Sequence, residues 1–277
     1  MIQVNDITYS YGRRKKPVLE HFSLTLEADS VYGLLGKNGT GKSTLLYLMS
    51  GLLRPQSGEV RVDGQDVARR RPEVLQEIFL VPEEFDLPAV TMDRYVSLNR
   101  PFYPRFSQEV LEECLADFDL PADLHLGELS MGQKKKAFMC FALAANTRYL
   151  FMDEPTNGLD IPSKSEFRRV VSRHMAADRT LVISTHQARD IDMLLDHVAI
   201  INGTRLLLNA ATADICARFR FEERPAGSPV DDALFVQPSL QGNAVVCPNT
   251  GDDDTPLDLE LLFNAVLSRP ELADSLQ

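Results

Sequence analysis

The sequence lacks the features that mark secreted or metal-stabilised proteins. It contains four cysteines in 277 residues, and none of them forms a CxxC pair or has the spacing of a zinc site. Such sparse cysteines are typical of a reducing cytosol, in which cysteine serves as a small buried hydrophobic residue. Because 44% of the residues are hydrophobic and 25% are charged, a chain of this length can form a self-supporting core without disulfide bonds or structural metal.

Long apolar runs are absent as well. The longest stretches, such as residues 45–53 and 138–145, are far shorter than the about 20 residues that a membrane-spanning helix requires. The first ten residues, MIQVNDITYS, lack a basic region followed by an apolar one, and we therefore expect no signal peptide. If the protein serves a membrane, we expect it to do so as a peripheral subunit.

An excess of positive charge is missing too. The formal net charge is −11, and an acidic surface repels phosphate backbones, which disfavours nucleic acid as a partner. The basic run at residues 13–16 is too short to reverse this balance. We interpret it as a solvated loop.

The first third of the chain is predicted to form short strands. Residues 18–26 alternate between apolar and polar side chains, as in a strand with one buried face. Residues 59–62 run into Asp63-Gly64, a common hairpin turn. Further strands are expected at residues 2–8 and 31–35, and the second of these leads into a glycine-rich loop and a helix.

A helical pattern follows over residues 87–146. Within it, residues 107–120 carry apolar side chains on one face and acidic side chains largely elsewhere. Two strongly apolar strands at residues 149–152 and 180–184 are separated by a helix-like stretch, and such alternation indicates a buried parallel sheet. A hairpin at residues 197–208 closes this part of the chain, and no internal repeat is present.

The composition changes towards the C-terminus. Residues 222–228 and 251–256 are rich in proline, glycine and acidic residues and are predicted to be linkers on either side of a small β unit. Residues 257–267 have the pattern of an amphipathic helix. We therefore divide the chain into a main domain, residues 1–215, and a small C-terminal appendage, residues 216–277.

The glycine-rich loop matches the phosphate-loop pattern G-x-x-x-x-G-K-[ST] in full, between a predicted strand and a predicted helix. Glycines let the backbone wrap around phosphates with N–H groups pointing inward, and the helix N-terminus adds partial positive charge. We expect Lys42 to reach the outer phosphates and Ser43 to offer its hydroxyl to Mg²⁺. The predicted nucleotide-binding residues of this segment are Gly36, Lys37, Asn38, Gly39, Thr40, Gly41, Lys42, Ser43 and Thr44.

Two carboxylates follow the apolar strand at residues 149–152. Asp153 and Glu154 would stand at the C-terminal end of a parallel strand, where ligands bind in such sheets. We predict that Asp153 holds Mg²⁺ and that Glu154 polarises the attacking water as a general base. His186 follows the strand at residues 180–184, and we predict that it contacts the γ-phosphate or orients the water.

A further motif, LSMGQ at residues 129–133, resembles the LSGGQ signature of the ABC ATPases. Other segments agree with this resemblance. Tyr11 resembles the aromatic residue that stacks on adenine in the family, residues 157–160 resemble its D-loop, and residues 184–186 resemble its switch-histidine motif. The resemblance covers roughly residues 1–210.

The resemblance implies a fold: an α/β P-loop NTPase of the ABC ATPase type, with a mixed sheet core, an antiparallel N-terminal β part, a helical subdomain at about residues 87–146 and a small C-terminal α+β appendage. It also implies that two ATPase subunits sandwich two ATP molecules head to tail. Ser130 and Gly132 of one chain would then contact the γ-phosphate held by Lys42 of the other. The signature and D-loop residues assigned to nucleotide binding are Ser130, Gly132, Gln133 and Asp160.

Three departures from the family pattern stand out. Glu83 follows Val81-Pro82 where the family usually has glutamine; a carboxylate can ligate Mg²⁺ but cannot donate a hydrogen bond. Met131 replaces the first glycine of the signature pair. The basic run Lys134-Lys135-Lys136 is unusual, and we interpret it as a solvated helix face near phosphate.

Together these features favour an ATP-binding and ATP-hydrolysing transporter subunit that uses ATP and Mg²⁺. Its expected partners are a second ATPase subunit and a separate integral membrane permease, with no nucleic acid, and its expected location is cytoplasmic, peripheral at the inner face of the cell membrane. Residues 99–104 and 258–263 resemble efflux-type subunits and favour export.

Two other readings remain open. A soluble ABC ATPase acting on ribosomes or DNA would resemble relatives with two ATPase units, long coiled coils or zinc motifs, which this sequence does not show. A regulatory module that binds ATP without turnover is disfavoured by the intact Asp153-Glu154 pair and by His186.

Overall fold

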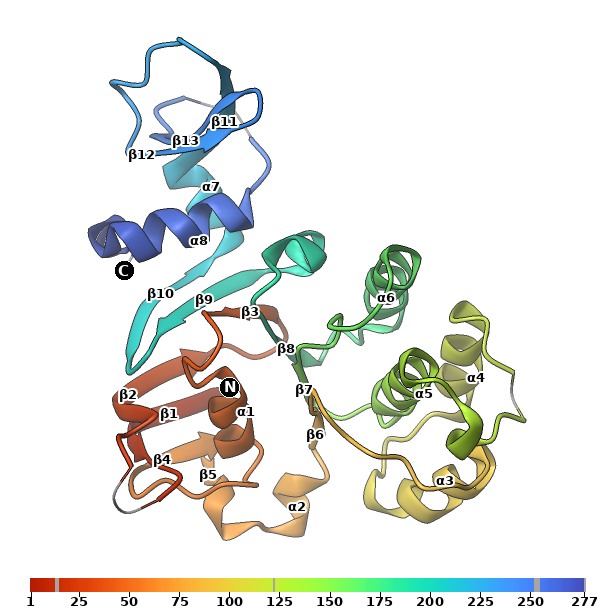
Figure 1. Ribbon diagram of the computed structural model, residues 1–277. Helices are drawn as coiled ribbons and strands as arrows, with labels where there is room; N and C mark the ends of the chain where they lie inside the picture. The colour runs from red at the N-terminus through yellow and green to blue at the C-terminus, as the bar shows by residue number, and fades with distance from the viewer. Residues whose placement is uncertain (13–14, 122, 252–254, 277) are drawn as a thin grey trace.

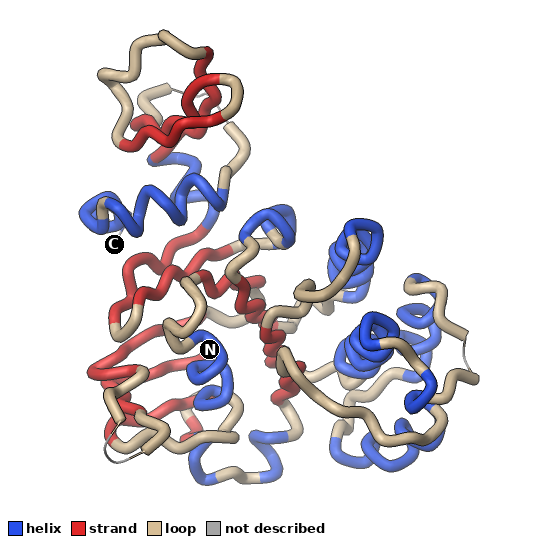
Figure 2. Tube along the Cα trace, viewed as in Figure 1, coloured by secondary structure: helices blue, strands red, loops and turns tan. Residues whose placement is uncertain are grey.

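The structure is a computed structural model that describes residues 1–12, 15–121, 123–251 and 255–276. Its strands form three sheets, and most of the helices gather on one side of the central sheet (Figures 1 and 2). Of the predicted basic loop, Arg13 and Arg14 lie outside the described residues, whereas Lys15 and Lys16 are exposed, as expected of a solvated loop.

The N-terminal sheet is antiparallel, with the strand order β2-β1-β4-β5. Alternating apolar residues of β2 face inward as predicted, and Asp63 and Gly64 form the turn between β4 and β5 with φ angles of 48° and 77°. Such left-handed angles match the twist of a two-residue hairpin. The strands are β1 (Ile2–Tyr9), β2 (Leu19–Leu26), β4 (Ser57–Val62) and β5 (Gln65–Asp66).

The central sheet has the order β10-β9-β3-β8-β7-β6, and every neighbouring pair is parallel except β10 and β9. The predicted mixed sheet is therefore confirmed. Its strands are β3 (Val31–Leu35), β6 (Ile78–Val81), β7 (Tyr149–Asp153), β8 (Thr180–Thr185), β9 (His197–Asn202) and β10 (Arg205–Ala211). Helix α1 (Lys42–Met49) packs between the two sheets, with Leu45, Leu46 and Leu48 in a core shared by both.

Helices cover the other face of the central sheet. The aromatic ring of Phe79 on β6 lies against Tyr103, Phe138 and Phe141 and joins the helical region to the sheet. The helix predicted at residues 107–120 is shorter than expected and ends at Asp117, because Asp119 has a left-handed φ of 53°. The helices of this half are α3 (Met92–Asn99), α4 (Gln108–Asp117), α5 (Met131–Ala144) and α6 (Ile161–His174). The short helix α2 (Pro72–Leu75) lies on the side of α1, where Val74 packs into the same core.

The C-terminal part consists of α7 (Thr212–Arg218), a three-stranded sheet of order β11-β13-β12, and α8 (Leu259–Ser268). The sheet is formed by β11 (Phe219–Pro225), β12 (Phe235–Ser239) and β13 (Gly242–Pro248). The prediction of a linker at residues 222–228 is wrong for residues 222–225, which belong to β11. Of the second predicted linker, residues 252–254 lie outside the described residues.

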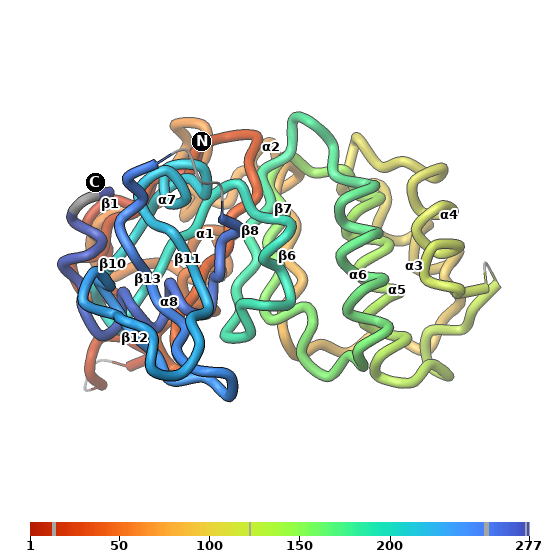
Figure 3. The backbone as a smooth tube through the Cα atoms, turned by 90° about the horizontal axis from the view of Figure 1, so that it is seen from above, coloured from red at the N-terminus to blue at the C-terminus, as the bar shows by residue number. Residues whose placement is uncertain are grey.

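This C-terminal part lies over the end of the molecule opposite to α3 and α4 (Figures 1 and 3). Side chains such as Phe221, Val246 and Leu262 continue the core of the main domain, and α8 contacts both β10 and the segment that follows His186. The boundary placed between residues 215 and 216 falls inside α7; the division into two domains stays a prediction. In the described parts of the chain, every helix is too short or too polar to cross a lipid bilayer.

Candidate nucleotide-binding site

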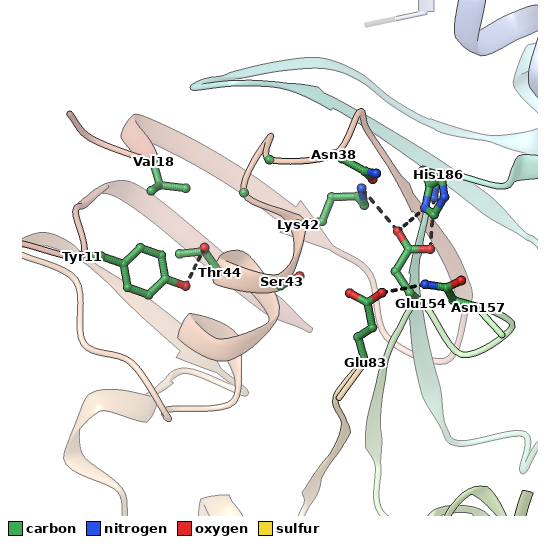
Figure 4. Close-up of a pocket in the computed structure, with 12 residues that line it drawn as sticks. Tyr11, Val18, Asn38, Lys42, Ser43, Thr44, Glu83, Glu154, Asn157 and His186 are labelled. Atoms are coloured by element: carbon green, nitrogen blue, oxygen red, sulfur yellow. Dashed lines mark hydrogen bonds and ion pairs between the residues drawn. The ribbon is translucent and has the colours of Figure 1, made fainter. Parts of the chain in front are cut away.

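A pocket of about 430 Å³ lies where the strands β3, β6, β7 and β8 end. Parallel strands present their carboxyl ends at one edge of a sheet, and the loops that leave this edge form the usual ligand site of α/β folds. The residues that line it are Tyr11, Val18, Asn38, Gly39, Gly41, Lys42, Ser43, Thr44, Glu83, Glu154, Asn157 and His186 (Figure 4).

The phosphate loop runs from β3 to α1 and encloses the Lys42 side chain. Gly41 has a φ of 96° and stands directly before α1, so that the backbone can turn into the helix where a side chain would be strained. The buried Lys42 ammonium donates to the carbonyl oxygens of Gly36 at 2.8 Å and Lys37 at 3.3 Å. Thr40 braces the same loop through a hydroxyl bond of 2.8 Å to Lys37 O. Three of the predicted loop residues do not line the pocket but make contacts within the loop: Gly36, Lys37 and Thr40. The other predicted loop residues line the pocket.

Tyr11 marks the opposite end of the pocket from the carboxylates (Figure 4). The residue is 53% exposed, and its hydroxyl lies 3.0 Å from the Thr44 hydroxyl. A half-exposed ring beside a phosphate loop offers a flat surface on which a base can stack. Val18, which the sequence did not single out, lines the pocket next to it.

Glu154 lies at the centre of the polar end of the pocket, where Lys42 and His186 point towards its carboxylate (Figure 4). Its Oε1 atom is 2.9 Å from His186 Nδ1 and 3.5 Å from Lys42 Nζ. Its Oε2 atom accepts hydrogen bonds from the Thr185 hydroxyl at 3.1 Å and from the His186 backbone N–H at 3.3 Å. The carboxylate is therefore held on both oxygens and keeps one fixed direction.

Asp153 and Ser43 offer the hard oxygen ligands that Mg²⁺ requires. Asp153 is buried, and burial raises the pKa of its carboxyl while the nearby hydroxyl groups of Ser184 and Ser43 oppose this. Its Oδ1 atom accepts a hydrogen bond from Ser184, whereas its Oδ2 atom is buried without a partner among the described residues. An orphaned carboxylate oxygen beside a hydroxyl fits the oxygen ligands of a magnesium ion, which Asp153 and Ser43 would hold.

Glu83 lines the same pocket and contacts Asn157, which was not among the predicted site residues. The Asn157 side-chain amide donates to Glu83 Oε1 at 2.7 Å, which joins the loop after β6 to the loop after β7. The D-loop resemblance was the one signal that could have drawn attention to Asn157 beforehand.

The interpretation of Lys134-Lys135-Lys136 as a solvated helix face is wrong for Lys135. Its side chain is 6% exposed, and it points from α5 towards the turn that follows β7. Burial lowers the pKa of Lys135, and the carboxylates of Glu83, Glu154 and Asp153 oppose this shift. Lys136 instead pairs with Glu166 on α6 at 2.6 Å.

The four residues predicted from the signature and D-loop motifs do not line this pocket. Ser130 caps α5 in a reciprocal box with Gln133: its hydroxyl accepts from the Gln133 N–H, and the Gln133 side chain accepts from the Ser130 N–H at 3.1 Å. Gly132 follows in the first turn of the same helix. Asp160 caps α6 by accepting from Ser163 N–H at 2.9 Å. Hydrogen bonding from the Ser163 hydroxyl, and after it from this N–H, lowers the pKa of the Asp160 carboxyl. One chain alone does not bring these groups to its own phosphate loop.

The amino-acid sequence of this chain is similar to those of known ATP-binding proteins. A protein-family model described as ABC transporter matches residues 19–157. The bacitracin transport ATP-binding protein BcrA of Bacillus licheniformis is 31% identical over 212 residues, which cover 75% of this chain and 68% of BcrA. The methionine import ATP-binding protein MetN of Carboxydothermus hydrogenoformans is 32% identical over 231 residues, which cover 78% of this chain and 67% of MetN.

Solved structures show the same fold. The structure of an ATP-binding subunit of an ABC transporter superposes with a TM-score of 0.68 at 23% sequence identity, over 77% of this chain and 91% of that chain.

Proposed function

Since this chain belongs to the ABC transporter family and is an ATP-binding ATPase of that family, we propose that it forms half of a head-to-tail dimer that drives export through a separate membrane permease. Peripheral attachment at the inner face of the cell membrane is part of the same proposal. The observation that carries the hydrolytic part of the proposal is the fixed Glu154 carboxylate, held by His186 and facing Lys42 at the phosphate loop.

The chain's own residues suit a hydrolytic displacement at the γ-phosphorus. The phosphate loop and Lys42 hold the triphosphate, with N–H groups and an ammonium directed at its oxygens. Glu154 accepts a proton from the attacking water as the new oxygen–phosphorus bond forms and the bond to ADP breaks. His186 donates to Glu154 or to the phosphate according to its tautomer. Asp153, Ser43 and Glu83 would hold Mg²⁺, which would supply charge neutralisation at the phosphate oxygens.

A second subunit completes the site in this proposal. The N-termini of α5 and α6 lie outside the chain's own pocket, and they expose the apolar side chains of Met131 (63%) and Ile161 (82%). Helix N-termini bind phosphate through free N–H groups and the helix dipole. Ser130 and Gly132 of one chain would contact the γ-phosphate bound by the other, and the two exposed apolar side chains would be covered in the same contact.

Mixing two inactive variants tests the head-to-tail arrangement. Lys42→Ala removes the phosphate ammonium of one pocket, and Ser130→Asp keeps the helix cap while placing a negative charge against the partner's phosphate. We expect each variant alone to lose ATP hydrolysis. In an equal mixture, half of the dimers are mixed and each of these has one intact site, so up to about a quarter of the parental activity should return.

The control pair is Lys42→Ala with Glu154→Gln. Both changes affect the pocket of the chain that carries them, so every site of a mixed dimer is defective and no activity should return. Full activity of Ser130→Asp alone, or equal recovery in both mixtures, would refute the composite site.

The direction of transport is proposed from a resemblance in the sequence. BcrA is named a transport protein and MetN an import protein, and the resemblance of residues 99–104 and 258–263 to efflux-type subunits favours export. Co-purification from membranes would identify the permease. With that complex in vesicles whose ATPase faces outward, export predicts ATP-dependent accumulation of substrate inside the vesicle, and loss of preloaded substrate would contradict it.

A further inference from the structure

Lys135 is a buried cation that the proposed chemistry does not use. It lies on α5, five residues after the Ser130 cap, which is about 7.5 Å along the helix axis. Its ammonium donates to the backbone carbonyl of Glu154 at 3.2 Å and to that of Asn157 at 2.7 Å. A lysine placed for solubility would extend into water, whereas this one spends its hydrogen bonds on a single turn of the backbone.

That turn carries the Glu154 side chain. Glu154 has a left-handed φ of 46°, which costs about 1–2 kcal/mol for a residue with a side chain. Its N–H donates to Ser184 O at 3.0 Å on one side, and on the other the Asn157 N–H donates to Glu154 O at 3.1 Å. The Lys135 ammonium on α5 donates to two carbonyl oxygens of the same turn. The Asn157 side chain joins this turn to Glu83 (Figure 4).

We propose that Lys135 is a positioning residue for ATP hydrolysis, which holds the turn at residues 154–157 from α5 and thereby directs the Glu154 carboxylate at the attacking water. The inference rests on the proposed role of Glu154 as general base. It deepens that role, because the same helix that begins at Ser130 and would meet the partner's nucleotide is tied within two turns to the chain's own catalytic carboxylate.

Substitution of Lys135 tests the proposal through the split between turnover and binding. Lys135→Met keeps the length of the side chain and removes its donors. We expect kcat at saturating ATP and Mg²⁺ to fall by about 10- to 100-fold, since a displacement of about 1 Å at a reacting group can cost that much. The dissociation constant for ATP, titrated separately with a fluorescent analogue, should stay within threefold of the parental value, because Lys135 donates to the turn after β7 whereas Lys42 and Thr40 hold the phosphate loop.

Lys135→Arg provides the rescue. Arginine restores donors to both carbonyl oxygens and should recover most of the lost turnover. If Lys135 only filled space, restoring the donors would not restore turnover. Lys136→Met is the matched control on the same helix: it removes the pair with Glu166 and should leave kcat within twofold. If Lys135→Met does not fold, Lys135→Gln, with a shorter donor, is measured in its place.

A loss of at least tenfold in kcat with unchanged ATP affinity, restored by arginine, supports the proposal. A smaller loss, a parallel loss of affinity or a failure of arginine to restore turnover overturns it. Failure of the proposed function is separate, because it appears as absent turnover in the parental protein or as retained turnover in Glu154→Gln.

Discussion

Replacement of Glu154 by glutamine separates nucleotide binding from hydrolysis. The change keeps the shape of the side chain and replaces one carboxylate oxygen by an NH₂ group. The resulting amide cannot accept a proton from water. Its backbone turn is held by Ser184 and Lys135 through main-chain atoms, so the position of residue 154 should be preserved.

The structure indicates how large the effects should be. Four groups contact the carboxylate, two on each oxygen. An amide retains one acceptor oxygen, and Lys42 retains its bonds to Gly36 O and Lys37 O. We therefore expect a loss in unfolding free energy of no more than about 1–2 kcal/mol. Removal of a general base costs about 10²–10⁴-fold in kcat, which corresponds to about 3–5 kcal/mol of activation free energy.

The assay measures phosphate release at saturating ATP and Mg²⁺, nucleotide affinity by titration, and mass by light scattering. ATP affinity should be equal or tighter, because a negative charge near the phosphates is lost, and the ATP-bound dimer should accumulate. Glu84→Gln is the control: it removes a neighbouring charge that lines a different pocket, and its kcat should stay within twofold. Turnover of Glu154→Gln within tenfold of the parental rate would refute the general-base role.

Three further outcomes follow from the structure. Glu83→Gln keeps an oxygen for the Asn157 amide and should retain activity within threefold in a phosphate-release assay, whereas Glu83→Ala should lose about tenfold; equal losses would show that the carboxylate charge is required. Burial raises the folded-state pKa of Asp153 above its ordinary value of 3.8. The charged carboxylate therefore destabilises the folded state at neutral pH, and this destabilisation disappears as the pH falls through the raised pKa towards 3.8. Asp153→Asn should therefore raise Tm at pH 7, by about 2–4 °C per kcal/mol relieved, and abolish Mg²⁺-dependent hydrolysis; the gain in Tm should vanish below pH 3.8, and a lowered Tm at pH 7 would contradict the burial argument. Gly58→Ala should cost at least about 3 kcal/mol by urea unfolding, because a β-carbon there would meet carbonyl oxygens of β1, while Gly64→Ala, at a similar positive φ in open space, should cost about 1 kcal/mol; equal costs would refute the role of the clash.

Local patterns predicted those parts of the site that consist of consecutive residues. The phosphate loop, the Asp63-Gly64 turn and the inward alternation of β2 depend on backbone angles and side-chain periods that a short segment specifies by itself. The apolar pattern predicted a helix at residues 107–120, but it did not predict where this helix ends. The pattern continues to residue 120, whereas the helix ends at Asp117 and Asp119 has a left-handed φ.

The error at β11 has a different cause. This strand forms an edge of its sheet, in the order β11-β13-β12. Phe219 and Phe221 are buried, while acidic residues and Pro225 occupy positions that an edge strand tolerates. Composition therefore suggested a linker where pairing with β13 makes a strand.

Arg179 illustrates contacts that only folding creates. It is fully buried, and burial lowers its pKa to about 10. Its guanidinium donates to Leu143 O and Thr147 O near the end of α5, more than thirty residues earlier in the chain. Nothing in its immediate sequence distinguishes it from a surface arginine.

The sequence alone determined that this chain binds a triphosphate, because a continuous loop of glycines, lysine and serine carries most of that chemistry within a few residues. Only the tertiary structure decided that Lys135 faces the turn that carries Glu154, that Glu83 contacts Asn157, and that Ser130 and Asp160 lie away from the chain's own pocket. The physical reason is that these relations depend on how separate strands and helices pack, and packing is set by the whole core rather than by any one segment.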